Sequence, residues 1–333
     1  MRDYLRTHEG EVRLFVVLAA LMLYLGLASP TFFTAGNLAS LLNNNAVNVI
    51  WAVGLLVVLI AGGIDISFAV GASVAQYLTA LALHAVGGGD WLFGLLFAGA
   101  FGIALGCINA SLIAGFRIIS IVATIATFNA FFGLLMFTTS GKSIYDLPDW
   151  WTDRIAVGSL GAGGALTLPV AGMVAAMAVT WFLISRTTTG RQIYAFGDNP
   201  EGARRAGVAT VKIQFIAYGW LGLMAGIGGL MQVNLAQEVV PNALIGRELD
   251  VLAAAVLGGA RLGGGRGSIL GVLLGIILVA MTQNGLNLLG ISPYAFKMIV
   301  GVIILVAITL SSEGVGKLIG SWRGAPMRQR TAQ

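Results

Sequence analysis

The sequence predicts an all-α fold, a polytopic membrane helical bundle of about ten transmembrane helices with both termini in the cytoplasm. Three observations predict it. Of the 333 residues, 57% are apolar before the 47 glycines are counted, against about 45–50% with glycine in soluble domains. Only 10% are charged, where about 25% is usual. The charged residues also leave long gaps between them. A globule of this size could not bury so much apolar surface, which excludes a soluble enzyme and a disordered chain.

The gaps between charged residues locate the membrane spans. The uncharged stretches lie between Arg13 and Asp65, Arg154 and Arg186, Lys212 and Glu238, and Arg266 and Lys297. Each is longer than the about 20 apolar residues that one helical crossing requires. The backbone must pair within each segment in lipid, and the alternating pattern of a membrane barrel is absent, so the spans are helices. We predict them at 14–29, 41–61, 67–84, 92–113, 118–138, 166–185, 213–234, 249–260, 268–286 and 296–312.

The basic residues orient the bundle. Of the 19 Lys and Arg residues, only Lys142, Arg154, Arg247 and Lys297 fall outside when the N-terminus is cytoplasmic, as the positive-inside rule requires. The eighth span is too short to cross alone, and we expect a half-helix completed by the glycine-rich stretch that follows. Deleting it would move the basic C-terminal tail outside. The net charge of +5 is therefore an orientation signal, and nucleic acid is excluded as a partner.

Two loops are long. Residues 139–165 fall outside and carry Tyr145, Trp150 and Trp151, which would either dock a partner protein or anchor at lipid headgroups. Residues 186–212 fall inside and are basic.

The inner loop contains the signature of a very short helix. Asn199 is a good N-cap and Pro200 fits the first helical position. Glu201 complements the positive end of the helix, and Gly207 stands where a left-handed C-cap is wanted. A helix of this length persists only when it packs against something. The plainer alternative is an ordinary basic hairpin.

Three stretches resemble the ribose/galactose-type (simple sugar) permeases of ATP-binding cassette (ABC) importers, which depend on a binding protein. Residues 194–208, YAFGDNPEGARRAGV, are similar to the cytoplasmic coupling segment of that family. Two further stretches are similar to the same permease family. The first is LIAGGIDIS at 59–67, and the second is GRELDVLAAAVLGGARLGGGRGSILG at 246–271 together with QNGLNLLGISPY at 283–294. The similarity extends from about Ser29 to Ile308. It implies one permease domain over residues 1–333, with a cytoplasmic coupling loop at 186–212.

The resemblance implies the membrane-spanning subunit of an importer that carries a sugar or sugar-like solute across the bacterial inner membrane. The chain itself would be no enzyme and would bind no cofactor or metal, because ATP and magnesium bind the partner. The implied partners are an ABC ATPase subunit, a second permease chain (identical or a paralogue) and a periplasmic or lipid-anchored sugar-binding protein. The implied ATPase-coupling residues are Asn199, Pro200, Glu201, Ala203, Arg204, Arg205 and Gly207.

Candidate pathway residues are Asn45, Asp65, Ser67 and Asn284. Asp65 or Ser67 would cap the third helix, or else line a broken helix in the pathway. Asparagines within a bundle either join helices or line a polar path. Together these asparagines favour an uncharged polyol as the substrate, because they offer hydrogen-bond donors and acceptors without a fixed charge. The family pattern departs at Phe68-Ala69, where Val-Gly is usual, and at Phe132, where Arg often precedes Gly133. These departures leave the particular sugar open.

Two further sets of residues carry weaker signals. Glu248 and Asp250 beside Arg247 predict an interfacial ion pair, or else a contact with the binding protein or an outer gate. Gly141-Lys142-Ser143 resembles the end of a phosphate-binding loop but lacks its first glycine, because Met136 stands there. The two histidines lie far apart in the sequence and predict no metal site.

Three other functions compete with the importer subunit. An ion-coupled secondary transporter of a small polar solute would place ionisable residues at the membrane midplane, where almost none are found. An intramembrane enzyme acting on lipid-linked sugars would need a clustered acid–base pair or metal ligands. A homologous permease could move a nucleoside or a branched-chain amino acid, although a charged substrate would want a fixed counter-charge.

Overall fold

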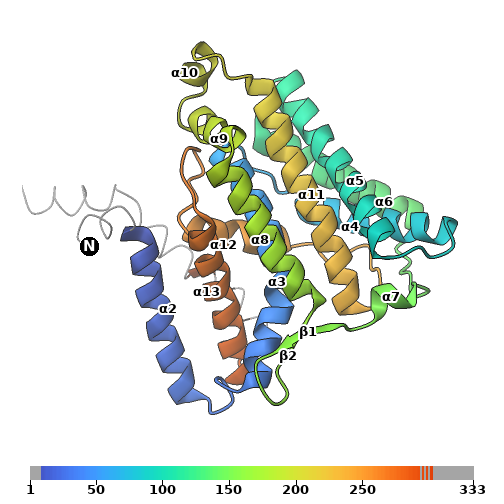
Figure 1. Cartoon of the computed structure of the whole chain (residues 1–333), viewed down its shortest axis with the longest axis vertical. Coiled ribbons are helices and arrows are strands. Elements are labelled where there is room, and N and C mark those ends of the chain that lie inside the picture. Colours follow the sequence, from blue (N-terminus) through green and yellow to red (C-terminus); the bar gives the residue numbers. More distant parts are fainter. Residues whose placement is uncertain (1–8, 293–294, 296–297, 299–300, 303–333) are drawn as a thin grey trace, which may run out of the picture.

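The computed structural model describes residues 9–292 together with 295, 298, 301 and 302. In that part of the chain, eight helices are long and apolar enough to cross a membrane. The tenth predicted span, 296–312, falls almost wholly outside the described residues. The eight helices are α2 (Glu9–Ala28), α3 (Ala35–Ile60), α4 (Phe68–Ala85), α5 (Trp91–Ala110), α6 (Ser120–Thr139), α8 (Leu168–Arg186), α11 (Thr210–Ala236) and α13 (Ile269–Leu288). The predicted helical membrane bundle is confirmed (Figure 1).

Helix α3 begins six residues before the predicted start because its polar first turns still belong to the helix. Thr34 caps it by accepting a hydrogen bond from the Asn37 N–H at 3.3 Å. Asn43, farther along, accepts the N–H of Thr167 at 2.9 Å. Asn43 therefore has a tertiary partner inside the protein, which apolar periodicity alone does not reveal.

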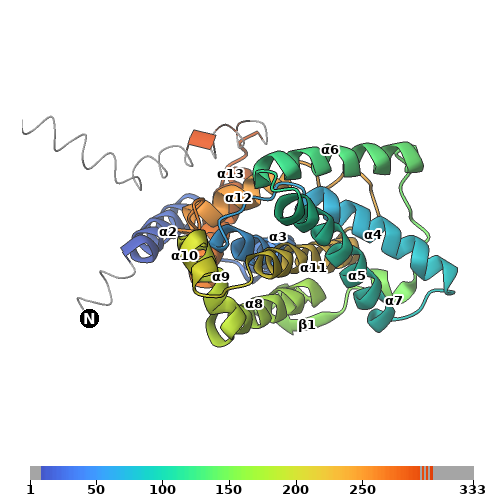
Figure 2. The same cartoon turned by 90° about the horizontal axis from the view of Figure 1, so that it is seen from above.

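Helix α3 forms the centre of the bundle. In its most hydropathic window 78% of residues are buried, against 67% in α11, 22% in α6 and 11% in α2. Seen from above, α3 lies between α2, α12 and α13 on one side and α11 on the other (Figure 2). The outer helices instead expose large apolar side chains such as Leu27 and Phe137, as lipid-facing helices do.

Helices α5 and α11 approach each other through glycine. A Cβ added at Gly102 would overlap the carbonyl of Gly222, and one at Gly222 would overlap the carbonyl of Gly102. One turn to either side the pattern repeats. A Cβ added at Gly226 would overlap the carbonyl of Ala98, and one added at Gly106 would overlap the carbonyl of Tyr218. Each helix thus carries two glycines four residues apart at the contact, the pattern that allows close packing of membrane helices.

The eighth predicted span is the short helix α12 (Arg247–Leu257, 11 residues). It is followed by glycine-rich turns up to Ser268, the N-cap of α13. The expected half-helix is therefore confirmed. It packs closely on α13, because Cβ atoms at Gly258 and Gly271 would each overlap the other's carbonyl.

The outer loop is folded onto the bundle and contains α7 (Asp149–Thr152), β1 (Ala156–Ser159) and β2 (Ala165–Thr167). The two strands pair antiparallel, a small hairpin that the sequence did not predict. Trp151 is fully buried, and its Nε1–H donates to the Leu230 carbonyl at 2.8 Å. Neither function expected of this tryptophan is correct: it holds the loop against α11 and faces neither lipid headgroups nor a partner.

Candidate functional site

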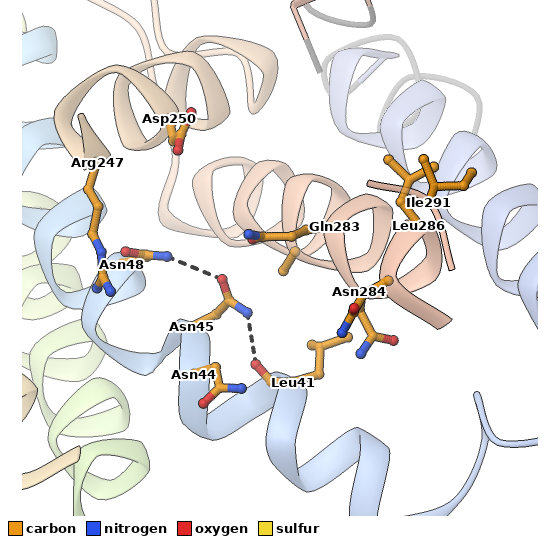
Figure 3. Close-up of a pocket in the computed structure, with 12 residues that line it drawn as sticks. Leu41, Asn44, Asn45, Asn48, Arg247, Asp250, Gln283, Asn284, Leu286 and Ile291 are labelled. Carbon is orange, nitrogen blue, oxygen red and sulfur yellow. Dashed lines mark hydrogen bonds between the residues drawn. The ribbon is translucent and has the colours of Figure 1, made fainter. Parts of the chain in front are cut away.

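A polar cavity of about 470 Å³ opens between α3, α12 and α13 (Figure 3). Two of the predicted pathway residues, Asn45 and Asn284, line it together, although they are far apart in the sequence. The other two, Asp65 and Ser67, do not line it. The lining residues are Leu41, Asn44, Asn45, Asn48, Arg247, Asp250, Ala280, Gln283, Asn284, Leu286, Asn287 and Ile291.

Six side-chain amides dominate the wall, three from α3 and three from α13. Some of these hold each other in place. The Nδ2 of Asn48 donates to the Asn45 Oδ1 at 3.2 Å, and Asn284 exchanges hydrogen bonds of 2.8 and 3.0 Å with Asn37. Within the described residues, the side chains of Asn44 and Gln283 have no hydrogen-bond partner. A wall of this kind presents both donors and acceptors to a neutral polar solute.

Helix α12 adds two charged side chains, Arg247 and Asp250. Their spacing of three residues puts them on one face of the helix. Glu248 lies between Arg247 and Asp250 in the sequence, but it is only 5% exposed and does not line the cavity. Its two carboxylate oxygens accept the N–H of Gly246 at 2.9 and 3.1 Å. Helical spacing alone could have predicted that Glu248 lies on a different face of α12 from Arg247 and Asp250. The sequence did not show that the face with Arg247 and Asp250 lies opposite the asparagines of α3.

Asp65 and Ser67 form a separate buried polar cluster with Asn109. The Asp65 Oδ1 accepts both the N–H and the hydroxyl of Ser67 at 2.7 Å, at the start of α4. The Nδ2 of Asn109 in α5 donates to the Asp65 Oδ2 at 3.0 Å and to the Ser67 hydroxyl at 2.8 Å. Asp65 therefore binds Ser67, the residue that precedes α4, and joins it to α5. The Ser67 side chain makes no capping hydrogen bond to α4, and a role of either residue in the pathway stays a prediction.

The predicted short helix of the inner loop is α10 (Pro200–Arg205), which follows α9 (Thr188–Asp198). Its predicted end signals are confirmed. The Asn199 Oδ1 accepts the Gly202 N–H at 2.9 Å, and Gly207 has a positive φ of 86°. The Val208 N–H donates to the Ala203 carbonyl at 3.0 Å and closes the C-terminal end.

Exposed charge covers the outer face of α10. Glu201 pairs with Arg204 at 2.9 Å and with Arg205 at 3.1 Å, and the hydrogen bonds from these two arginines lower the pKa of Glu201. All three side chains are more than half exposed, whereas Ala203 is buried. Figure 1 shows α10 projecting from one end of the bundle, beyond α9 and the start of α11. The helix therefore presents an exposed charged surface to solvent and packs against the rest of the chain through Ala203.

Close contacts, most of them between backbone atoms, join α9 to α3 and to the loop between α12 and α13. We call this set of contacts the backbone junction. The Gly265 N–H, in the loop between α12 and α13, donates to the Ile60 carbonyl at the end of α3 at 2.8 Å. A Cβ at Gly197, near the end of α9, would overlap that same carbonyl. The Tyr194 hydroxyl of α9 donates to the Gly267 carbonyl at 2.8 Å. Helix α9 therefore contacts both the end of α3 and the α12–α13 loop.

Comparison with known proteins identifies the class. Residues 37–308 match the family described as "branched-chain amino acid transport system / permease component". The chain is 32% identical over 311 residues to the ribose import permease protein RbsC of Escherichia coli K12, covering 91% of this chain and 94% of that protein. It is 34% identical to the ribose import permease protein RbsC of Bacillus subtilis, covering 90% and 92%. It is 28% identical to the galactose/methyl galactoside import permease protein MglC of Escherichia coli K12, covering 92% and 95%. No solved structure matches the chain significantly.

The fold and these matches define a multi-pass, non-catalytic membrane component of an ABC importer of the bacterial inner membrane. The chain belongs to the permease family of these importers. Members of this class work with an ATPase and a binding protein.

Proposed function

We propose that the chain translocates a neutral, hydroxyl-rich solute, a sugar or sugar-like molecule, through the cavity between α3, α12 and α13. The observation that carries this proposal is the amide wall contributed by two helices. Side-chain amides can donate and accept at once, which hydroxyl groups require. The similar proteins are named for import of ribose and of galactose with methyl galactoside, which supports the same class of solute.

A branched-chain amino acid is the second candidate. The family description names such a substrate, and Arg247 with Asp250 offers one positive and one negative group. However, an amino acid bound to these two charges would leave most of the six amides without a solute partner. A solute that displaces water from such amides without forming hydrogen bonds to them costs free energy, so the amide wall favours the polyol.

The energy would come from an ATPase partner, which would bind ATP and magnesium and dock on α10 within the coupling loop 186–212. The residues proposed for this contact are those of the short helix and its caps, from Asn199 to Gly207. Closure of two ATPase subunits would move α10, and the backbone junction at Ile60, Gly197 and Gly265 would carry the movement to the cavity. A second permease chain would complete the pathway, and a sugar-binding protein would deliver the solute.

The test is uptake into proteoliposomes that contain the whole importer and its binding protein. We expect radiolabelled D-ribose or D-galactose to accumulate only when ATP is supplied. Asn45→Ala is expected to lower the rate about tenfold, because it removes a cavity amide that also accepts a hydrogen bond from Asn48.

The matched control is Asn129→Ala. Asn129 lies on α6, and within the described part of the chain its amide donates a hydrogen bond to Ile125 of its own helix and to no other residue. Its uptake rate should equal that of the wild type. Uptake driven by an ion gradient without ATP would contradict the proposal in favour of a secondary transporter. Accumulation of L-leucine instead of both sugars would support the second candidate.

A further inference from the structure

Arg247 is the cationic side chain of the cavity wall, and the structure holds it in a defined place. It is the first residue of α12, directly after Gly246, whose φ of 91° is left-handed. The Gly246 N–H is bound by the buried carboxylate of Glu248. The start of the helix is therefore fixed at the residue that carries the guanidinium.

A second contact orients the guanidinium itself. Its Nη1 donates to the Gln232 Oε1 of α11 at 2.8 Å. A guanidinium has five N–H donors in a rigid fork. Gln232 is the one side chain in the described part of the chain that accepts a hydrogen bond from Arg247. Other donors are therefore left for a solute at the cavity wall, where Arg247 reaches from α12 toward α3 and lies beside Asn48 (Figure 3).

The neighbouring charge decides what kind of solute fits. Asp250 lines the same cavity three residues along the helix, and its negative charge acts on Arg247. An anionic solute attracted by the arginine would also lie near the aspartate, whose negative charge would repel it. A guanidinium fork matches two oxygen atoms held side by side. Two adjacent hydroxyl groups supply such a pair of oxygens without a net charge.

We propose that Arg247 is a specificity-determining residue that selects solutes with two adjacent hydroxyl groups, and that Gln232 is the positioning residue that orients it. This inference rests on the proposed function. It assigns recognition of the vicinal diol to α12, and leaves the general polarity of the pathway to the amides of α3 and α13.

The experiment compares methyl β-D-ribofuranoside, which has adjacent hydroxyls on C2 and C3, with methyl 2-deoxy-β-D-ribofuranoside, which has no adjacent pair. Both are tested in the whole reconstituted importer with its binding protein. The measured quantity is the ratio of the two uptake rates. The binding protein is the same in every sample, so a change of the ratio between variants comes from the permease. Arg247→Lys keeps the charge but loses the fork. We expect it to lower the ratio about tenfold.

Gln232→Ala is expected to lower the ratio less than Arg247→Lys does, because it frees the guanidinium without removing it. Asn129→Ala on α6 should leave the ratio unchanged. A merely structural role of Arg247 would lower both uptake rates equally and leave the ratio as in the wild type. An unchanged ratio in Arg247→Lys, with uptake of methyl β-D-ribofuranoside intact or reduced, would overturn the inference while the proposed function stands. A wild-type importer that takes up L-leucine but neither sugar would overturn both.

Discussion

Replacing Gly222 with leucine is expected to abolish the folded permease. Even the Cβ of the new side chain would overlap the Gly102 carbonyl, and neither backbone can retreat while the next glycines along each helix stay in contact. Overpacking a close interface costs about 1–3 kcal/mol, and more when backbone must move. The folded, monodisperse fraction in mild detergent, measured by size-exclusion chromatography, should fall at least about tenfold.

Gly133→Leu is the matched control. Gly133 lies on α6, where a Cβ would meet no atom within 4 Å, and the helix already exposes large apolar residues such as Leu134. This variant should elute with wild-type yield. Wild-type yield for Gly222→Leu would show that α5 and α11 do not approach as closely as their glycines indicate.

Loss of the Glu201 and Arg204 side chains together is expected to stop uptake and leave the fold intact. Both are more than half exposed, so their removal opens no cavity in the bundle. Surface ion pairs of this kind contribute about 0–1 kcal/mol to stability. If α10 docks on the ATPase, however, the double alanine variant removes part of the interface. Uptake should fall at least about tenfold, and the solute should no longer stimulate ATP hydrolysis.

Arg191→Ala controls for loss of basic charge from the same loop. Arg191 is exposed on α9, away from α10, and its replacement should leave uptake near the wild-type rate. Normal uptake by the Glu201 and Arg204 double variant, with wild-type amounts in the membrane, would rule out docking through this helix.

Local signals in the sequence predicted local structure well. Asn199, Pro200 and Gly207 fixed both ends of a six-residue helix, because capping depends on atoms within a few residues of each other. The shortness of α12 was also predictable, since charge and glycine bound it on either side. The orientation of the termini stays a prediction that rests on the placement of basic residues.

Only some of the cavity residues could be predicted from the sequence, because tertiary packing decides which polar side chains line the cavity. Asn45 and Asn284 were chosen as polar residues in apolar spans, and they do line one cavity. Asp65 carried the same signal, yet its carboxylate is occupied by Ser67 and Asn109. A sequence shows that a polar group needs a partner in the membrane, but not whether that partner is another helix or a solute. Arg247 was missed as a cavity residue for the same reason.

Docking of the ATPase on α10 is the central element of the proposed mechanism. The direct measurement places a single cysteine at Arg205, which is exposed on α10, in a chain whose one native cysteine, Cys107, is replaced by serine. Leu160, exposed in the outer hairpin loop, provides the matched position. After cross-linking in native membranes and mass spectrometry, the account predicts an ATP-binding subunit joined to position 205 and absent from position 160. Cross-linking of that subunit at neither position, while it co-purifies with the chain, would contradict it.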